Sequence, residues 1–487
     1  MSHVRLLPRF ALGLSLSLAL PGALPAHAQG FDQSQLPSLG GASPSASQEE
    51  FRLGRAWLRQ FRAQAPVWQD AIVSDYFEGL VARLTPYSQL GGLNTTTVMV
   101  DHRSLNAFAV PGGVVGINSG LFAFADDEAE FASVIAHELG HLSQRHYARG
   151  SERAGQTQLP AMAGMLAGML IAASGGGEAG IAAAMGSQAA VMQDRLAYSR
   201  RFEQEADRVG LQAMATAGFD PEAMVRMFAS MQRLARLQGG TPPEFLLTHP
   251  VSDSRLSDAQ ARVAQLTVAD SYRSDTLYDL MRARALLSIY ANTPDQALSR
   301  LAQDGADESA RRYLGALISA RRGQVDSALG ELDRLAAEYP DYAMLPASAA
   351  EVALQANRID EAITRAERWL RFMPSYLPAQ MILAEAQLQR DPRAAFDLLR
   401  RITDRYPENP QAFNLLATAA GRSGYNGWGH LAQAEYLQLT GRVDRGIQQL
   451  AIAKSAAQQE NDTALTALID QRREAFLDYR DALSTFN

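Results

Sequence analysis

The C-terminal half of the chain repeats itself at a nearly constant spacing, and this limits the possible folds more than any other feature. The segment Gly323-Gln-Val-Asp-Ser-Ala-Leu recurs 34 residues later as Asn357-Arg-Ile-Asp-Glu-Ala-Ile, and a further copy begins at Gly441. A proline recurs with nearly the same period. Small residues let paired helices approach closely, and proline ends the second helix of a pair. From about residue 277 onward the sequence therefore predicts stacked pairs of helices.

A period of 34 residues with these features is the signature of tetratricopeptide repeats. Such arrays present a concave surface on which a polypeptide partner can bind. The spacing from Ala395 to Gly446 is about one and a half periods, so we expect one additional helix near residues 408–430. We therefore predict an all-α tetratricopeptide superhelix over residues 271–487.

The N-terminus has the pattern of an export signal. Arg5 and Arg9 precede an apolar run, Phe10–Leu20, and Ala26-His27-Ala28 has the small-x-small pattern of a cleavage site. The apolar run is too short to span a bilayer. We predict a cleaved signal peptide over residues 1–28, and the alternative is an uncleaved anchor.

The composition limits the cellular compartments and the classes of partner that fit this chain. The chain has no cysteine, which excludes a structural disulfide and a thiol nucleophile, and an exported protein of this kind fits a soluble periplasmic location. The formal net charge is −7, so no basic excess indicates nucleic acid. Residues 29–50 are rich in Gly, Ser, Pro and Gln and predict a flexible leader, with the folded region beginning at Phe51.

The motif His-Glu-Leu-Gly-His at residues 137–141 carries the chemistry. We expect it on a helix that begins near Asp126 and runs to about Arg149. Residues at i and i+4 share a helix face, so His137 and His141 can aim both imidazoles at one ion. Zinc suits two imidazoles and a carboxylate with a fourth position for water. Glu138 would then take the proton of that water and pass it to the leaving amine, which predicts a zinc-dependent peptidase.

The third metal ligand is expected in the acidic helix segment 202–207. Glu203 and Asp207 lie at i and i+4, so one could bind zinc while the other holds a ligand histidine from behind. Spacing alone leaves Glu203 and Glu205 equally suited as ligand, although Glu205 is expected to point elsewhere into solvent.

The remaining histidines of the mature chain divide into two kinds. His102, His146 and His430 stand alone and predict surface or satisfied core residues. His249 precedes Pro250 and another helix, so it is either a loop residue before a proline-started helix or a group that faces the zinc.

Two further segments have recognisable patterns. Residues 95–101 predict a strand, and residues 106–117 predict a hairpin in which Pro111 and Gly112 occupy the centre of a type II turn. Residues 159–192 are mostly Ala, Gly, Met, Leu and Ile. They predict a buried helical pair, a mobile apolar flap over the site, or a hairpin that touches a membrane.

Four ordered motifs resemble the gluzincin family that includes HtpX and the CAAX prenyl proteases. They are His-Glu-x-x-His at 137–141, Glu-x-x-x-Asp at 203–207, Asn-Ala-Phe-Ala-x-Pro-Gly-Gly at 106–113 and His-Pro-x-x-x-x-Arg at 249–255. The resemblance runs from about residue 51 to 270. It implies an α+β gluzincin (zincin) metalloprotease domain that is mostly helical with a small β-sheet.

The resemblance also implies roles for single residues. It makes Glu203 the third zinc ligand and Asp207 the carboxylate that holds a ligand histidine. It places His249 and Arg255 near the developing oxyanion, where a donor helps most. In one group of the family, the histidine that matches His249 can cap the zinc and keep the enzyme latent. The edge strand to which an extended substrate adds by backbone pairing would contain Asn106, Ala107, Phe108 and Ala109.

That group consists of the BepA-type periplasmic proteases, which combine a signal peptide with C-terminal tetratricopeptide repeats. The resemblance to them covers nearly the whole mature chain. It implies a chaperone-like zinc endopeptidase that degrades unfolded or stalled outer-membrane β-barrel proteins and works near the barrel assembly machinery.

Two other interpretations stay open, an assembly chaperone or adaptor that acts mainly through the repeats and a general periplasmic turnover protease. HtpX and the CAAX proteases have transmembrane helices where this chain has the weakly hydrophobic segment 159–192, which favours a soluble or peripheral enzyme.

Overall fold

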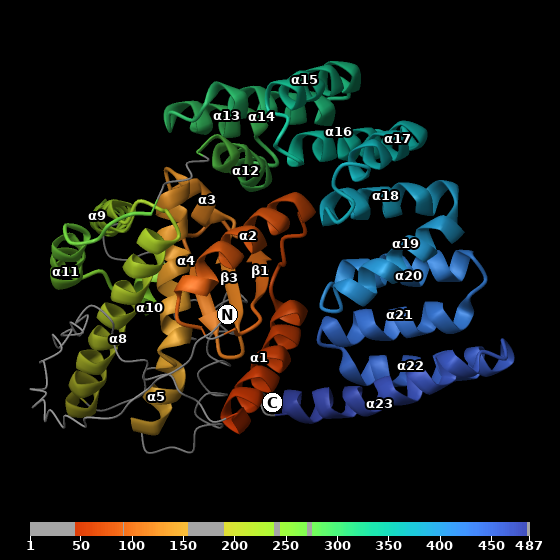
Figure 1. The fold of residues 1–487 in the computed structure, drawn as a ribbon, viewed down its shortest axis with the longest axis horizontal. Helices are drawn as coiled ribbons and strands as arrows, with labels where there is room; N and C mark the ends of the chain where they lie inside the picture. The colour runs from red at the N-terminus through yellow and green to blue at the C-terminus, as the bar shows by residue number, and fades with distance from the viewer. Residues whose placement is uncertain (1–43, 91, 154–188, 238–243, 270–274, 485–487) are drawn as a thin grey trace, which may run out of the picture. The chain divides into compact units, whose positions relative to one another are not determined.

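The computed structural model describes residues 44–90, 92–153, 189–237, 244–269 and 275–484 (Figure 1). The predicted signal peptide lies outside the described residues. So does segment 159–192, except for its last four residues, which begin a helix. Within the described ranges, no helix combines the length and the apolar character that crossing a bilayer requires.

The N-terminal region consists of helices around a small sheet. Its elements are α1 (Pro44–Gln64), α2 (Ala71–Leu84), a 3-10 turn η1 (Thr85–Tyr87), β1 (Thr96–Val100), β2 (Ala107–Val110), β3 (Val114–Asn118), α3 (Gly120–Phe124), α4 (Glu128–Ser143), α5 (His146–Arg153), α8 (Ala189–Thr216), α9 (Glu222–Leu237), α10 (Glu244–Thr248) and α11 (Asp253–Val263). Helix α1 begins at Pro44, seven residues before the expected start, so the end of the predicted flexible leader is helical.

The three strands form one sheet in the order β1-β3-β2. Strands β2 and β3 are antiparallel, with Val110 opposite Val114, and this confirms the predicted hairpin. Gly112 has φ +84° at the second central position of the turn, where a side chain would be strained. Strand β1 pairs in parallel with β3, which leaves β2 at an edge of the sheet.

Helix α4 carries the His-Glu-x-x-His motif and is buried along almost its whole length. The side chain of Asp127 caps its N-terminus by accepting a hydrogen bond from Glu130 N at 2.7 Å. The helix ends at Ser143, so the expected extension to Arg149 is wrong. Arg145 adopts φ +49°, a left-handed conformation that interrupts the helix before α5 begins at His146.

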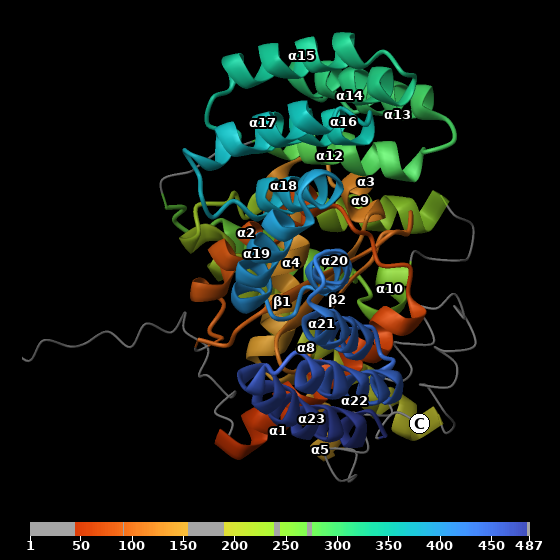
Figure 2. The same ribbon diagram turned by 90° about the vertical axis from the view of Figure 1, so that its right-hand side faces the viewer.

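The C-terminal region contains helices only. They are α12 (Asp275–Ile289), α13 (Pro294–Gln303), α14 (Glu308–Arg321), α15 (Val325–Glu338), α16 (Met344–Gln355), α17 (Ile359–Leu370), α18 (Leu377–Arg390), α19 (Pro392–Arg405), α20 (Pro410–Arg422), α21 (Asn426–Leu439), α22 (Val443–Gln459) and α23 (Thr463–Leu483). From α14 onward each helix packs against the next (Figures 1 and 2).

The sequence repeat marks equivalent places in these helices. Gly323, Asn357 and Gly441 each precede a helix with a positive φ, and the small residues Ala328, Ala362 and Gly446 are buried where helices cross. Two helices, α20 and α21, separate α19 from α22, whereas α16 alone separates α15 from α17. The predicted additional helix is therefore present.

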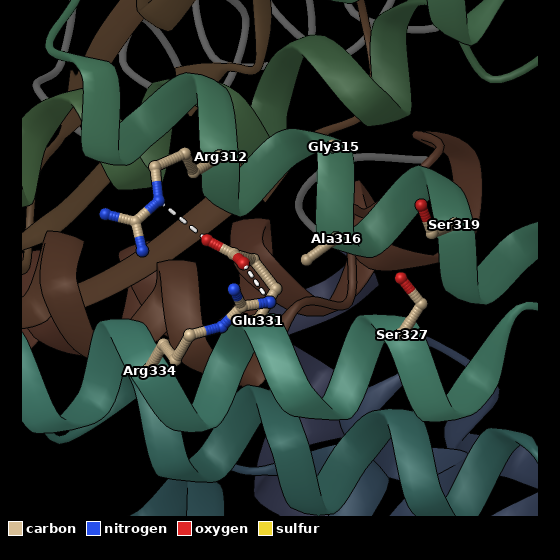
Figure 3. Close-up of a pocket in the computed structure, with 7 residues that line it drawn as sticks. All are labelled: Arg312, Gly315, Ala316, Ser319, Ser327, Glu331 and Arg334. Atoms are coloured by element: carbon tan, nitrogen blue, oxygen red, sulfur yellow. Dashed lines mark hydrogen bonds and ion pairs between the residues drawn. The ribbon is translucent and has the colours of Figure 1, made fainter.

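The two regions share a continuous hydrophobic core. Arg284 of α12 joins them by an ion pair to Asp70, the N-cap of α2, at 2.8 Å and another to Glu351 of α16 at 2.9 Å. A hollow of about 550 Å³ lies between α14 and α15, where Arg312 and Arg334 flank Glu331 (Figure 3). None of the residues that line this hollow belongs to the His-Glu-x-x-His region.

Candidate metal centre

Four side chains from three segments converge on one point. His137 and His141 lie on α4, Glu203 on α8, and His249 directly after α10. His137 Nε2 is 3.0 Å from His141 Nε2 and 3.4 Å from Glu203 Oε2. His141 Nε2 is 3.3 Å from Glu203 Oε1. His249 Nδ1 is 3.4 Å from His137 Nε2 and 3.1 Å from Glu203 Oε1.

These separations match a metal site. Four ligands placed tetrahedrally at zinc bond lengths lie roughly 3.3–3.6 Å apart. One donor atom from each of the four residues lies within 4.8 Å of the others. The three ligands from helices are buried, so nitrogen and carboxylate donors face one another with little water between them. The donor set therefore fits a divalent ion.

Glu138 lies beside this donor set but does not belong to it. Its carboxylate is buried, and Oε1 has no hydrogen-bond partner among the described residues. His249 Nε2 is 3.5 Å from the same atom. A buried carboxylate oxygen without a hydrogen bond is costly, so its retention next to metal donors indicates a group that acts on a bound molecule.

Two glycines allow α8 to approach α4 closely. A Cβ at Gly140 would lie 2.7 Å from Ala206 O, and a Cβ at Gly210 would lie 3.1 Å from the backbone carbon of Ala136. The backbones are therefore in direct contact on both sides of the motif. This contact sets the distance between the two histidines of α4 and Glu203 of α8.

Asp207 contacts the Nδ1 side of His137, where a carboxylate that supports the ligand histidine was expected. Its Oδ1 is 2.8 Å from His137 Nδ1, and this bond leaves His137 Nε2 for the ion. Burial would lower the pKa of His137, but the hydrogen bonds and charges of Asp207 and Glu203 outweigh it and raise this pKa to about 9. Burial, opposed only in part by the charge of Glu203, lowers the pKa of His141 to about 3.

Arg255 is buried, and its guanidinium contacts neighbouring carboxylates and a backbone carbonyl. Nε and Nη2 each donate to Asp207 at 2.7 Å, Nη1 lies 2.8 Å from Glu203 Oε2, and Nη1 also donates to Pro250 O at 2.9 Å. Although burial would raise the pKa of Asp207, the Arg255 charge lowers it below its usual value. All three guanidinium nitrogens are thus engaged with protein oxygens, and through them Arg255 holds Asp207 and Glu203 in place.

The predicted substrate strand is β2, with Asn106 just before its first residue. Ala107 and Ala109 face the core that contains α4, whereas Phe108 packs on Trp57 and Phe61 of α1. Asn106 O accepts from Asn118 N at 3.0 Å, which continues the pairing with β3. Within the described ranges, no strand pairs with the second edge of β2.

Sequence reasoning missed two residues near the centre. His146 was predicted only as a surface or satisfied core residue; it is buried, and its Nδ1 is 2.9 Å from Nδ1 of His141. Glu205 was expected in solvent, but it contacts His146 Nε2 at 3.1 Å and Arg149 Nη1 at 2.7 Å. Burial would raise the pKa of Glu205, yet these two hydrogen bonds lower it to about 2. The spacing from His141 to His146 gave no signal, because the helix break between them is not visible in the sequence.

Comparison with known proteins agrees with this geometry. Residues 73–263 match the model of peptidase family M48. The chain is 32% identical to the beta-barrel assembly-enhancing protease of Escherichia coli K12 over 95% of both chains. It is 34% identical to the protein of that name from Yersinia pestis over 91% of this chain and 92% of the relative.

A more distant likeness covers only about a third of the chain. The mitochondrial metalloendopeptidase OMA1 of Arabidopsis thaliana is 28% identical over 34% of this chain and 31% of its own length. The predicted resemblance to a metallopeptidase family is therefore confirmed, and the chain belongs to peptidase family M48.

Proposed function

We propose that the chain is a periplasmic zinc-dependent metalloendopeptidase that acts in the assembly and quality control of outer-membrane β-barrel proteins. One observation carries the enzymatic part, namely the buried Glu138 carboxylate, whose Oε1 accepts no hydrogen bond among the described residues, beside His137, His141 and Glu203. The relatives named beta-barrel assembly-enhancing proteases, which match along almost the whole chain, support the biological part.

His137, His141 and Glu203 would hold the zinc ion. Zinc in such a site polarises a scissile carbonyl and makes water more acidic. Glu138 serves as the general base that takes the proton of the attacking water and passes it to the leaving amine. Asp207 fixes the ring of His137, and Arg255 holds Asp207 and Glu203 in place through its guanidinium.

His249 keeps the enzyme latent in this proposal. Catalytic zinc sites keep one position open, whereas closed four-ligand sites are structural. His249 Nδ1 lies as close to Glu203 and His137 as the other donors do, so it would hold the fourth position of a bound ion. His249→Ala is expected to raise proteolysis. If this variant keeps its zinc but loses all activity, His249 is an oxyanion donor instead of a latch.

Substrate would add to the second edge of β2, with which no strand pairs within the described ranges and whose strand packs against α4. An extended polypeptide along Asn106, Ala107, Phe108 and Ala109 would pair through its backbone, which makes recognition largely independent of its side chains. Such recognition suits an enzyme whose substrates are unfolded barrel proteins of varied sequence.

The helices from α12 onward would form the tetratricopeptide region, which binds the substrate or the barrel assembly machinery. The proposed organisation is a signal peptide at 1–28, a leader at 29–50, a protease domain at 51–270 and repeats at 271–487. The proposal includes no nucleic-acid partner. For residues 159–192 we propose peripheral contact with a membrane surface and no membrane span.

A comparison of two substrates tests the function. The mature protein and its Glu138→Gln variant are incubated with unfolded porin and with casein, and intact substrate is followed by gel. We expect loss of porin with the unaltered protein alone, because glutamine cannot accept the proton. Equal degradation by both forms would refute the mechanism. Cleavage of casein without cleavage of porin would favour a general turnover protease, and protection of porin from aggregation without cleavage would favour a chaperone.

A second experiment tests the ligand assignment. Metal analysis is expected to give about one zinc per chain, and much less for Glu203→Ala. Zinc retained by that variant would contradict the choice of Glu203.

A further inference from the structure

His146 contacts the Nδ1 side of His141, one of the two candidate metal donors on α4. The Nδ1 atoms of His141 and His146 are 2.9 Å apart, and their rings meet nearly edge to face at 79°. His146 is buried, and its opposite face stacks on Phe202 with ring centroids 4.1 Å apart. The contact is therefore a packed feature of the interior.

The break in the helix after α4 creates this contact. In a continuous helix, residues five positions apart differ by about 140° around the axis, so His146 would face away from His141. Arg145 interrupts the helix with φ +49°, and its guanidinium is paired with Glu50 of α1. This left-handed residue turns the chain so that the first residue of α5 faces back toward the metal centre.

Only one hydrogen can lie between Nδ1 of His141 and Nδ1 of His146, so one of these nitrogens donates and the other accepts. His141 Nε2 faces the other metal donors and must be free of hydrogen to bind an ion, so Nδ1 carries the proton. His146 Nδ1 must then accept this hydrogen, and His146 Nε2 carries its own toward Glu205 Oε2 at 3.1 Å. Arg149 Nη1 donates to the same oxygen at 2.7 Å and holds the carboxylate.

We propose that His146 and Glu205 are positioning residues that fix the tautomer and the ring orientation of the ligand His141. The two α4 ligands are then supported differently. Asp207 holds His137 directly, whereas Glu205 holds His141 through His146. Loss of such outer partners weakens metal binding by about tenfold to a hundredfold in known metal sites. This inference rests on the proposed zinc-binding function and adds the residues that tune it.

Paired substitutions of one residue test the proposal. His146→Phe keeps a ring that can stack on Phe202 but offers no acceptor, whereas His146→Gln offers an amide oxygen. Zinc affinity of the full chain is measured by competition with a chromophoric chelator. We expect about tenfold to a hundredfold weaker binding for His146→Phe and binding within about threefold of the unaltered chain for His146→Gln. His430→Phe on α21, in a different helical region, serves as the control with unchanged affinity.

A spectroscopic readout separates positioning from general damage. The Nδ1–H proton of His141, seen by NMR in histidine-labelled zinc-bound protein, should be present in the unaltered chain and in His146→Gln and be lost in His146→Phe. Equal zinc affinity for His146→Phe and the unaltered chain would overturn the proposal, and so would equal weakening by both substitutions. If His146→Phe does not fold, Glu205→Met decides, because unchanged affinity there would also overturn it. Failure of the unaltered chain to bind zinc would instead refute the proposed function.

Discussion

Replacing Gly140 by alanine should separate the two helices that supply the metal donors. A Cβ at this position would lie 2.7 Å from Ala206 O and 2.9 Å from Ala206 Cα, whereas ordinary contacts begin near 3.4 Å. Helix α8 would therefore have to retreat by about 0.7 Å, because the atoms in the way are backbone. Metal sites tolerate changes of only about 0.2 Å in ligand distance. We expect zinc binding to weaken at least tenfold, since Glu203 moves with α8.

The same substitution should also destabilise the fold. Overpacking a core costs about 1–3 kcal/mol, and the better helix propensity of alanine returns about 0.5–1 kcal/mol. The net loss in the free energy of unfolding is thus about 0–2.5 kcal/mol, with a central value of about 1 kcal/mol, measured by urea titration of metal-free protein. Gly79→Ala on α2 is the matched control, because no atom lies within 4 Å of a Cβ there. That variant should gain stability slightly and bind zinc normally.

The outcome that refutes this reasoning is specific. If Gly140→Ala unfolds at the same urea concentration as the unaltered chain and binds zinc equally well, the helices do not depend on a glycine contact for their spacing. Loss of stability without loss of zinc affinity would mean that Glu203 follows the histidines when α8 moves.

Three further predictions concern charged groups. Burial raises the pKa of Asp75 to about 6, so the stability that this group contributes is complete below about pH 4 and is lost as the pH rises through 6. Asp75→Asn should therefore raise the free energy of unfolding at pH 8 by about 1–2 kcal/mol, after allowance for partial exposure, and change it little near pH 3.5; an equal effect at both pH values would contradict this. Arg284→Met leaves the carboxylates of Asp70 and Glu351 without their shared partner and should cost about 3–5 kcal/mol in a urea titration. A loss below 1 kcal/mol would show that this ion pair does not join the two regions. Arg255→Lys keeps the charge but loses the two-pronged contact, so zinc binding should weaken about tenfold in chelator competition, and unchanged binding would argue against the holding role.

Local periodicity predicted the elements that depend on neighbours in sequence. The shared face of His137 and His141 follows from helix geometry, and the hairpin turn follows from Pro111 and Gly112. The sequence repeat located the helix pairs and the additional helix before α22, because each unit repeats the same small and apolar contacts. These features needed no knowledge of which distant segments meet.

The spacing of residues in the sequence could not predict which distant segments are in contact. Glu203 and Glu205 are equal candidates in the sequence because both lie on one helix of unknown rotation. The glycine contact between α4 and α8 turns Glu203 toward the two histidines and leaves Glu205, about 200° further round, to meet His146. Likewise, spacing alone could not show that the Arg255 guanidinium contacts both Asp207 and Glu203.

The sequence by itself thus predicted the chemistry, since two proposed metal ligands and the proposed general base are contained in five consecutive residues. Only the tertiary structure decided how that chemistry is completed and supported. The third donor, the fourth donor His249 and the histidine behind His141 all depend on backbone approach and on the left-handed turn at Arg145, and neither is a property of any short stretch of residues.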